Sequence, residues 1–295
     1  SDVCSSDLSE AAIQEHVATP LGLDVLQAAE AILTVANAKM AGAIRVVSIE
    51  RGHDPRQFAY MPFGGGGGLH VCAMMREVGV TTGIVPRYPG VTSALGCVMA
   101  DMRHDAVQTL NKSLNELDLD QLKSKLQSLA TSCQQRLDSA GVQFESVQEV
   151  IALDMLYMGQ THTLQVTLPA GDITRDGIQT AFESAYAAAF GRVLKGLVIR
   201  VMNLRYARIG VRPKFDLSVL APTGAGSMQA LGVQRVFHAG QWCEAQRYAR
   251  LDLPVGAVIH GPAILEQADT TVWLEPGFTA RVDTLGNLLV EKETV

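Results

Sequence analysis

The spacing of apolar residues predicts helices in the first part of the chain. Across residues 23–52 apolar residues recur at steps of three and four, the period of an α-helix, and Asp24 and Gly52 suit its two ends. Apolar and small residues cover a wide face of this segment, so we expect a helix buried on more than one side. Residues 119–137 place leucines on one face and polar residues on the other, which predicts an amphipathic packing helix.

The segment between these two helices begins with the order of a βαβ unit. An apolar run at 58–63 precedes five consecutive glycines, 69–78 has a helical pattern closed by Gly79, and 80–86 is typical of a strand. A short helix rich in small residues is expected at 92–101.

The pattern becomes strand-like after about residue 145. Polar and apolar residues alternate from 161 to 168, the period of a half-buried strand, whereas 172–190 has the period of a helix. Further strand-like runs lie at 197–211, 233–237, 272–274, 278–282 and 288–291. The sequence therefore predicts an α/β protein whose first part is mixed and whose second part is β-rich.

Composition narrows the class of protein. The chain has 295 residues, 47% hydrophobic and 18% charged, which is typical of a globular protein of about two domains. The net charge of −6 gives no electrostatic reason to expect nucleic acid, and charged or polar residues interrupt every long apolar stretch, so we expect no membrane span. The five cysteines are scattered and odd in number, which predicts neither a disulfide framework nor a zinc site and favours a reducing cytoplasm.

The first residues do not match the rest of the chain. Residues 1–8 have no apolar period and resemble a translated sequencing-adaptor sequence, so we expect residues 1–10 to be non-native or disordered. The native pattern then begins in mid-helix near Ala11, which predicts a chain truncated at its N-terminus.

The glycine run Gly64 to Gly68 is the strongest candidate for ligand contact. Glycines let a backbone approach a ligand without a Cβ in the way, and amides before a helix start can bind an anion or line a nucleotide. No Gly-Lys-Ser/Thr sequence closes the run as in a P-loop, and the third glycine of a dinucleotide fingerprint would fall at Leu69. Tight strand–helix packing is the alternative explanation, and composition does not decide between them.

A second cluster of polar residues comes after the first long helix. Arg51, His53, Asp54 and Arg56 lie where its C-terminus meets a loop, a common place for functional groups. The alternative is structural, with the arginines capping helix carbonyls and Asp54 setting a turn before Pro55. The spacing of the histidines and aspartates near residues 70 and 101–105 requires no metal, and no catalytic residue can be nominated.

Ordered motifs along the chain carry a family resemblance. In the first half they are Ala36-Asn37-x-x-Met40-x-x-Ala43-Ile44-Arg45, Ser48-Ile-Glu-Arg-Gly-His-Asp-Pro-Arg56, Phe63-Gly-Gly-Gly-Gly-Gly-Leu-His70, Val85-Pro-x-x-Pro-Gly90 and Ala100-Asp101. In the second half they are Asp154-Met-x-Tyr157-x-Gly159-Gln160, Phe182-x-x-x-Tyr186-x-x-x-Phe190-Gly191, Asn203-Leu-Arg205, Gly261-Pro-Ala-Ile264 and Asp269-Thr-Thr271. With these motifs the chain after residue 10 resembles the C-terminal portion of the hydantoinase A/5-oxoprolinase family.

The resemblance implies an ATP-dependent enzyme that opens cyclic amides such as hydantoins and 5-oxoproline, with ATP and Mg²⁺ as cofactors. It implies that residues 11–140 form the second lobe of an actin/Hsp70-like ATPase fold and that 141–295 form a β-rich C-terminal domain. Members act beside a hydantoinase B-type subunit or domain, which predicts a hetero-oligomer. The family's Asp-x-Gly-Gly-Thr phosphate-binding motif does not occur in this sequence.

The resemblance also assigns residues. It implies nucleotide contact by Gly64, Gly65, Gly66, Gly67, Gly68 and His70. It implies a site-lining role for Asn37, Arg45, Arg51, His53, Asp54, Arg56 and Asp101. Two departures stand out, because Gly66 and Gly68 replace the more usual Ala and Pro, and Leu156 stands where an arginine is common.

Two other functions are compatible with these motifs. One is the ATP-using subunit of a ketone carboxylase of the acetone carboxylase type, which shares the phosphoryl step but forms a C–C bond. The other is an inert scaffold that only docks a larger partner subunit.

Overall fold

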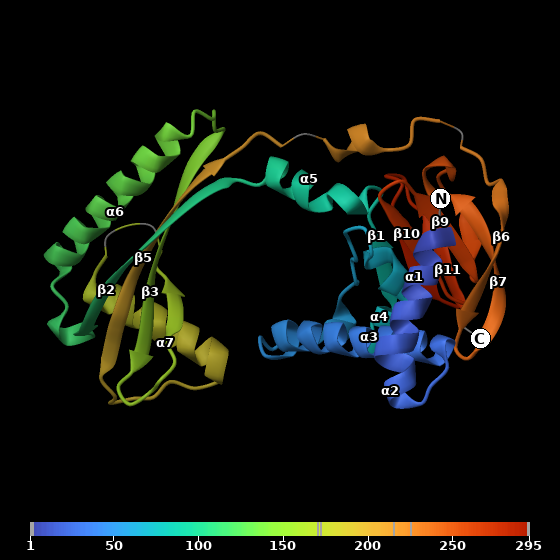
Figure 1. The fold of residues 1–295 in the computed structure, drawn as a ribbon. Helices are drawn as coiled ribbons and strands as arrows, with labels where there is room; N and C mark the ends of the chain where they lie inside the picture. The colour runs from blue at the N-terminus through green and yellow to red at the C-terminus, as the bar shows by residue number, and fades with distance from the viewer. Residues whose placement is uncertain (1–2, 170, 172, 215, 225, 294–295) are drawn as a thin grey trace. The chain divides into compact units, whose positions relative to one another are not determined.

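The structure, a computed structural model, describes residues 3–169, 171, 173–214, 216–224 and 226–293. The chain packs into two compact units. The first contains Ser1–Cys97 together with Asp216–Val295, and the second contains Val98–Phe215. Each unit is a mixture of helices and strands (Figure 1), so the prediction of an α/β protein is confirmed at this level.

The first unit begins with helices. They are α1 (Val3–Ile13), α2 (Thr19–Leu21), α3 (Val25–Ile49), α4 (Val71–Val78) and α5 (Thr92–Met99), the last of which reaches into the second unit. Asp24 caps α3 through a reciprocal pair of hydrogen bonds with Gln27, in which each side chain accepts from the other's backbone N–H. The N-terminal segment expected to be non-native or disordered is helical from Val3, which does not test whether it is native, and residues 1–2 lie outside the described residues.

The expectation that the long helix is buried on several sides is wrong for α3. Ala28 and Ala41 are its buried residues, whereas Leu33, Val35 and Val47 are each more than half exposed. The helix packs mainly against α4, and Met40 and Ile44 reach the core of the first unit, whereas most of its large apolar side chains are exposed in this chain. Among the described residues α3 is also the one helix with the length and apolar composition of a membrane span, a test that helices of soluble proteins and signal sequences pass too.

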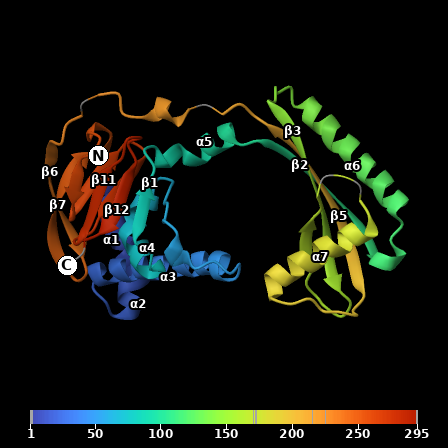
Figure 2. The ribbon, with the colours of Figure 1, turned by 180° about the vertical axis from the view of Figure 1, so that it is seen from behind.

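Two four-stranded sheets complete the first unit. One has the order β1 (Thr82–Val85), β12 (Leu288–Lys292), β11 (Phe278–Val282) and β8 (Val258–His260). The other has the order β10 (Thr270–Leu274), β9 (Ala263–Gln267), β7 (Gln241–Ala249) and β6 (Ala230–His238), with β7 and β9 parallel. Helix α4 lies between α3 and these strands in both views (Figures 1 and 2), and its buried residues join theirs in one core.

This arrangement differs from the predicted division of the chain at residue 140. Strand β1 pairs with β12, so residues 82–85 and 288–292 share one sheet although about 200 residues separate them. The predicted βαβ unit is also only partly formed. Its first strand is reduced to a single parallel bridge between Tyr60 and Gly83 beside α4 and β1.

The second unit is an antiparallel sheet covered on one face. Its strands have the order β2 (Met102–Ser113), β5 (Ile199–Val211), β3 (Ser146–Tyr157) and β4 (Leu164–Thr167). Helices α6 (Leu119–Ser139) and α7 (Arg175–Phe190) share one hydrophobic core with these strands, which places both helices on the same face. The sequence predicts both helices, and the expected start of α7 at Asp172 lies outside the described residues.

Candidate functional site

A cavity of about 630 Å³ lies in the first unit beside the start of α4. Helix α3 lines it with residues three and four apart, which share one helix face, and β6, β10 and the turns after them form the opposite wall. The lining residues are Glu30, Leu33, Thr34, Asn37, Leu69, His70, Ala73, Arg76, Val236, Phe237, His238, Ala239, Trp273 and Glu275. Two predicted residues, Asn37 and His70, therefore meet in one cavity.

His70 is held in place by Asn37. The Nδ1 atom of His70 lies 2.7 Å from Oδ1 of Asn37, and because an amide oxygen can only accept, Nδ1 carries the proton in this arrangement. His70 directly precedes α4, at the end of the short 3₁₀ turn Gly67–His70. The contact joins α3 to the start of α4 on the wall of the cavity.

Glu275 is the most buried charged residue of this cavity, at 3% exposure. Its carboxylate accepts a hydrogen bond from Arg76, and Nε2 of His238 lies 3.6 Å from the same oxygen. Trp273 and His238 meet edge to face, with ring centroids 5.9 Å apart. The cavity thus combines aromatic surface with carboxylates of Glu30 and Glu275 and one arginine that is already paired.

The glycine run packs against β10, next to this cavity. A Cβ on Gly68 would lie 2.8 Å from the carbonyl oxygen of Thr271, and the hydroxyl of Thr270 donates to the carbonyl oxygen of Gly65. Gly64 has a φ of 84°, which favours glycine, whereas a Cβ on Gly66 would meet nothing within 4 Å. Close packing therefore explains Gly68, whereas Gly64 and Gly66 have open space at their Cβ positions. None of the five glycines is among the residues that line the cavity.

The polar cluster after α3 forms a separate pocket. Arg45, His53, Asp54 and Arg56 line a volume of about 480 Å³, while Arg51 is exposed outside it. Asp54 accepts from the backbone N–H of Arg56 and begins the turn Pro55–Gln57, as the structural alternative expects. Arg56 pairs with Asp54 at 2.8 Å instead of capping a helix carbonyl, and this hydrogen bond lowers the pKa of the Asp54 carboxyl.

Asp101 belongs to the second unit. It accepts from Nζ of Lys214 at 2.6 Å and from the backbone N–H of Arg212, which ties β2 to the end of β5. The hydrogen bond from Lys214 holds the pKa of this carboxyl below its ordinary value. These contacts give Asp101 a structural explanation.

The residues around the cavity do not favour thiol or metal chemistry. Cys72 is buried behind it, and burial raises the pKa of its thiol to about 12, so the thiol stays protonated near neutral pH. In the part of the chain that the structure describes, no group of three or more His, Cys, Asp or Glu side chains is placed to hold a metal ion.

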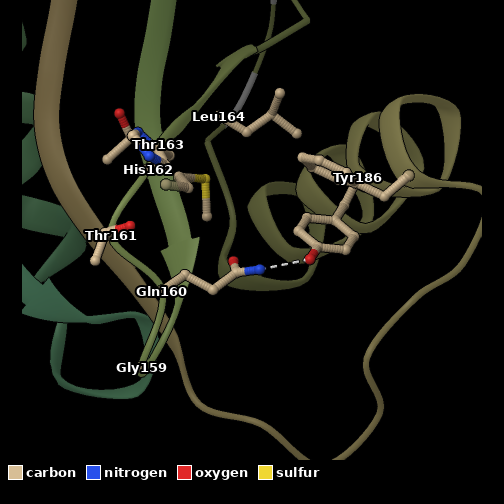
Figure 3. Close-up of a pocket in the computed structure, with 9 residues that line it drawn as sticks. Gly159, Gln160, Thr161, His162, Thr163, Leu164 and Tyr186 are labelled. Atoms are coloured by element: carbon tan, nitrogen blue, oxygen red, sulfur yellow. Dashed lines mark hydrogen bonds between the residues drawn. The ribbon is translucent and has the colours of Figure 1, made fainter.

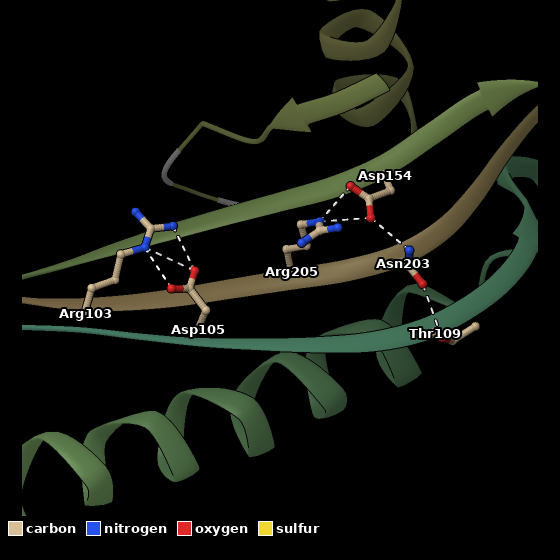
Figure 4. A network of polar contacts seen from close by, with 6 residues as sticks. All are labelled: Arg103, Asp105, Thr109, Asp154, Asn203 and Arg205. Atoms are coloured by element: carbon tan, nitrogen blue, oxygen red, sulfur yellow. Dashed lines mark hydrogen bonds and ion pairs between the residues drawn. The ribbon is translucent and has the colours of Figure 1, made fainter. Parts of the chain in front are cut away.

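The motifs of the second unit converge on two faces of its sheet. On the helix-covered face Gln160 donates from Nε2 to the hydroxyl of Tyr186 at 2.6 Å beside a small pocket (Figure 3). On the opposite face the carboxylate of Asp154 accepts from Arg205 at 2.7 Å and from Asn203 at 2.8 Å (Figure 4). Residues quoted from separate sequence motifs are therefore direct partners in space.

Sequence reasoning misses several cavity residues. Glu275, Arg76, Trp273 and His238 are not among the predicted site residues, because the two partners of the Arg76–Glu275 pair lie 199 residues apart. One local signal is present, since Glu275 directly follows a strand in which every second residue is buried and stands before a Pro-Gly turn. A charged residue between a buried strand and a turn is a reasonable candidate for a buried ion pair.

The chain belongs to the hydantoinase/oxoprolinase family. The family model described as "Hydantoinase/oxoprolinase" matches residues 3–106, and the one described as "Hydantoinase/oxoprolinase C-terminal domain" matches residues 111–293. The recognition made from the motifs is thereby confirmed.

Two relatives and one solved structure show where the similarity lies. The caprolactamase subunit alpha of Pseudomonas jessenii is 30% identical over 281 residues, covering 92% of this chain and 40% of that protein. The crystal structure of the ATP-dependent caprolactamase from Pseudomonas jessenii matches 96% of this chain and 42% of its own with a TM-score of 0.72 at 28% identity. 5-Oxoprolinase 1 of Arabidopsis thaliana is 28% identical over 92% of this chain and 21% of that protein.

A structure of nucleotide-free acetone carboxylase has the same fold, with a TM-score of 0.72 at 22% identity over 96% of this chain and 42% of that chain. This chain spans about 40% of the length of the caprolactamase subunit that it matches.

Proposed function

We propose that this chain acts within an ATP-dependent enzyme that opens a cyclic amide. The observation that carries the proposal is the match over 96% of the chain to the structure of an ATP-dependent caprolactamase, at 28% identity. A named 5-oxoprolinase among the relatives points to the same class of ring. The whole activity is proposed to need more than this chain, which spans less than half of the length of these relatives.

ATP would transfer its γ-phosphoryl group to the amide oxygen, leaving ADP. Water would then attack the activated carbon, the ring C–N bond would break, and hydrolysis would release the phosphoryl group as inorganic phosphate. The chain's own contribution is proposed to be the adenosine side of the nucleotide site, beside Gly66, His70 and Asn37. The cavity suits a planar base better than a triphosphate. Trp273 offers aromatic surface, whereas Glu30 and Glu275 would repel phosphates and Arg76 is already paired.

The remaining parts of the site are proposed to lie outside this chain. The lobe that contains α3 and α4 would be the second lobe of an actin/Hsp70-like ATPase. A hydantoinase B-type subunit or domain would be its partner in a cytoplasmic hetero-oligomer. Mg²⁺ would arrive with the nucleotide, and we assign it no ligands among the described residues because they offer no cluster to hold it.

Ketone carboxylation is the second candidate. The fold shared with acetone carboxylase, and the 24% identity to the acetone carboxylase beta subunit of Xanthobacter autotrophicus over 92% of this chain, favour it. Both reactions use ATP to activate an oxygen atom, so the nucleotide step does not separate them. The substrate that stimulates ATP hydrolysis distinguishes the two reactions.

The test is ATP hydrolysis by the protein co-expressed with a hydantoinase B-type partner. We expect stimulation by ε-caprolactam, hydantoin or 5-oxoproline and none by acetone with bicarbonate. Gly66→Val should raise the Kd for a non-hydrolysable ATP analogue by about tenfold or more, because the added side chain occupies the open side of the loop.

Gly96→Val is the matched control, since a Cβ on Gly96 also meets nothing within 4 Å but lies in α5. Calorimetry gives both Kd values. Stimulation by acetone and bicarbonate alone would replace ring opening with carboxylation. An unchanged Kd for a folded Gly66→Val variant would leave the glycine run with a packing role only.

A further inference from the structure

The small pocket of the second unit is built from two family motifs that the proposed nucleotide site does not use. It has a volume of about 300 Å³, at the lower end of ligand-pocket sizes. The loop between β3 and β4 lines it with residues 159–163, and α7 contributes Tyr186 and Phe190. Met155 and Leu164 complete its apolar surface.

The polar groups of this pocket have fixed orientations. The backbone N–H of Tyr157 donates to Oε1 of Gln160 at 3.2 Å, so the amide nitrogen of Gln160 is the atom that faces Tyr186. That nitrogen donates to the hydroxyl oxygen of Tyr186 at 2.6 Å, as Figure 3 shows. The hydroxyl oxygen is thus an acceptor in this bond, and its own hydrogen is left to donate.

No acceptor for that hydrogen is found in the described part of the chain, although Tyr186 is only 5% exposed. Because Tyr186 lines the pocket, this hydroxyl can donate its hydrogen to a ligand carbonyl there. Figure 3 shows Leu164 extending from β4 beside the Gln160–Tyr186 pair. A bound group would therefore meet a hydrogen-bond donor on one side and apolar surface on another.

An aromatic wall continues this surface to the exterior. The rings of Tyr186 and Phe190 lie 4.5 Å apart between centroids, and Phe190 is 59% exposed at the end of α7. The other aromatic contacts of Tyr186, with Tyr157 and Phe182, are edge to face or tilted and hold the ring from behind. Phe190 offers its ring without being needed for the core.

The pocket also lacks fixed charge. None of its nine lining residues is Asp, Glu, Lys or Arg, and His162 in the exposed loop is the one residue among them with an ionisable side chain besides Tyr186. A carboxylate entering it would lose water without gaining a cation. The pocket therefore suits an uncharged ligand.

We propose that this pocket binds a small uncharged ring that carries a carbonyl group. The carbonyl oxygen accepts from the Tyr186 hydroxyl, and the apolar part of the ring packs on Phe190 and Leu164. Identifying the ring as a lactam rests on the proposed function. The pocket then favours neutral lactams over 5-oxoproline, which bears a carboxylate.

The test is binding of ε-caprolactam and of 5-oxoproline to the 295-residue chain, measured without ATP by ligand-observed NMR titration. We expect saturable binding of ε-caprolactam and at least about tenfold weaker binding of 5-oxoproline. Tyr186→Phe should weaken ε-caprolactam binding about five- to tenfold, because it removes the hydroxyl that donates to the carbonyl and that accepts from Gln160. Phe190→Ala should weaken it about threefold or more through lost ring contact.

Tyr206→Phe is the matched control. Its hydroxyl is also in the second unit but is bonded to Glu149 at 3.1 Å and Arg208 at 3.0 Å, so ring binding should not change. If Tyr186→Phe does not fold, the exposed Phe190 still tests the proposal. No saturable binding of ε-caprolactam, equal affinity for the two rings, or an unchanged Kd in the folded pocket variants would each overturn it.

The same variants separate this proposal from the proposed function. Ring binding that depends on Tyr186, without ring-stimulated ATP hydrolysis in the assembled enzyme, would sink the proposed function and keep the pocket. Ring-stimulated ATP hydrolysis whose KM for the ring is unchanged by Tyr186→Phe would overturn the pocket proposal and keep the proposed function.

Discussion

The cavity of the first unit and the pocket of the second unit differ in the charge of the residues that line them. In the first, carboxylates, an arginine and histidines share the cavity wall with aromatic rings. In the second, the pocket is uncharged, and the Asp154–Arg205 pair lies on the other face of the sheet (Figure 4). Strand geometry makes this separation possible, because Asp154 and Met155 are neighbours in β3 and point to opposite faces.

The difference separates the kinds of ligand that each unit can take. A helix wall such as α3 presents every third or fourth side chain to one cavity, so polar and apolar residues mix there. A strand alternates its side chains, so an ion pair and an apolar pocket can use consecutive residues without interfering. Variants of both units test this comparison, beginning with the one of largest expected effect.

Removing the Glu275 carboxylate from the cavity should lower the stability of the fold. Glu275→Ala should lower the free energy of unfolding by about 2–4 kcal/mol. It removes a buried carboxylate, leaves an empty space in its place and leaves Arg76 without its ion-pair partner. Urea unfolding followed by circular dichroism measures the loss.

The control for Glu275 is Glu266→Ala. Glu266 also pairs with an arginine, Arg247, at 2.6 Å, but both side chains are about one-third exposed. Its loss should cost about 1 kcal/mol or less. Equal losses in the two variants would mean that the buried charge of the cavity has no special structural role.

The wall beside the cavity provides the next test. Gly68→Ala should cost about 1–3 kcal/mol, since the new Cβ would press on Thr271 and on Val272 of β10. Gly66→Ala, two residues away, should change the free energy of unfolding by less than about 0.5 kcal/mol because its Cβ meets nothing within 4 Å. The same urea experiment compares the two, and similar losses would show that the run does not pack as described.

How far the sequence predicts this structure depends on how local each signal is. Helix α3 is predictable because its period and its Asp24 cap lie within one segment. Strand β2 is missed because its core-facing positions include His104 and Gln108, so apolar residues do not alternate regularly. Its regular alternation of burial is visible only once it pairs with β5.

The candidate site is predictable only in part for the same reason. Asn37 and His70 are nominated through motifs and do meet, but Glu275 joins them from the far end of the chain. The packing role of Gly68 likewise depends on Thr271, about 200 residues away. The hydrogen bond between Gln160 and Tyr186 joins two separate motifs, and neither motif by itself indicates the other as its partner.

Lowering the pH should remove the stabilisation that Asp154 provides on the face of the second unit's sheet opposite the helices. Burial alone would raise the pKa of Asp154, but hydrogen bonds from Arg205 and Asn203 outweigh it, so the folded-state pKa lies below its ordinary value. A carboxyl with a lowered pKa stabilises the fold above about pH 4, its unfolded value, and this contribution is lost as pH falls through the folded pKa. Asp154→Asn should therefore cost about 1 kcal/mol at pH 7, and the difference from the native chain should shrink below about pH 4. Asp105→Asn, whose pair with Arg103 is half exposed, should cost less. If Asp154→Asn also weakens ε-caprolactam binding, the two faces of the sheet are not independent and the comparison fails for the second unit.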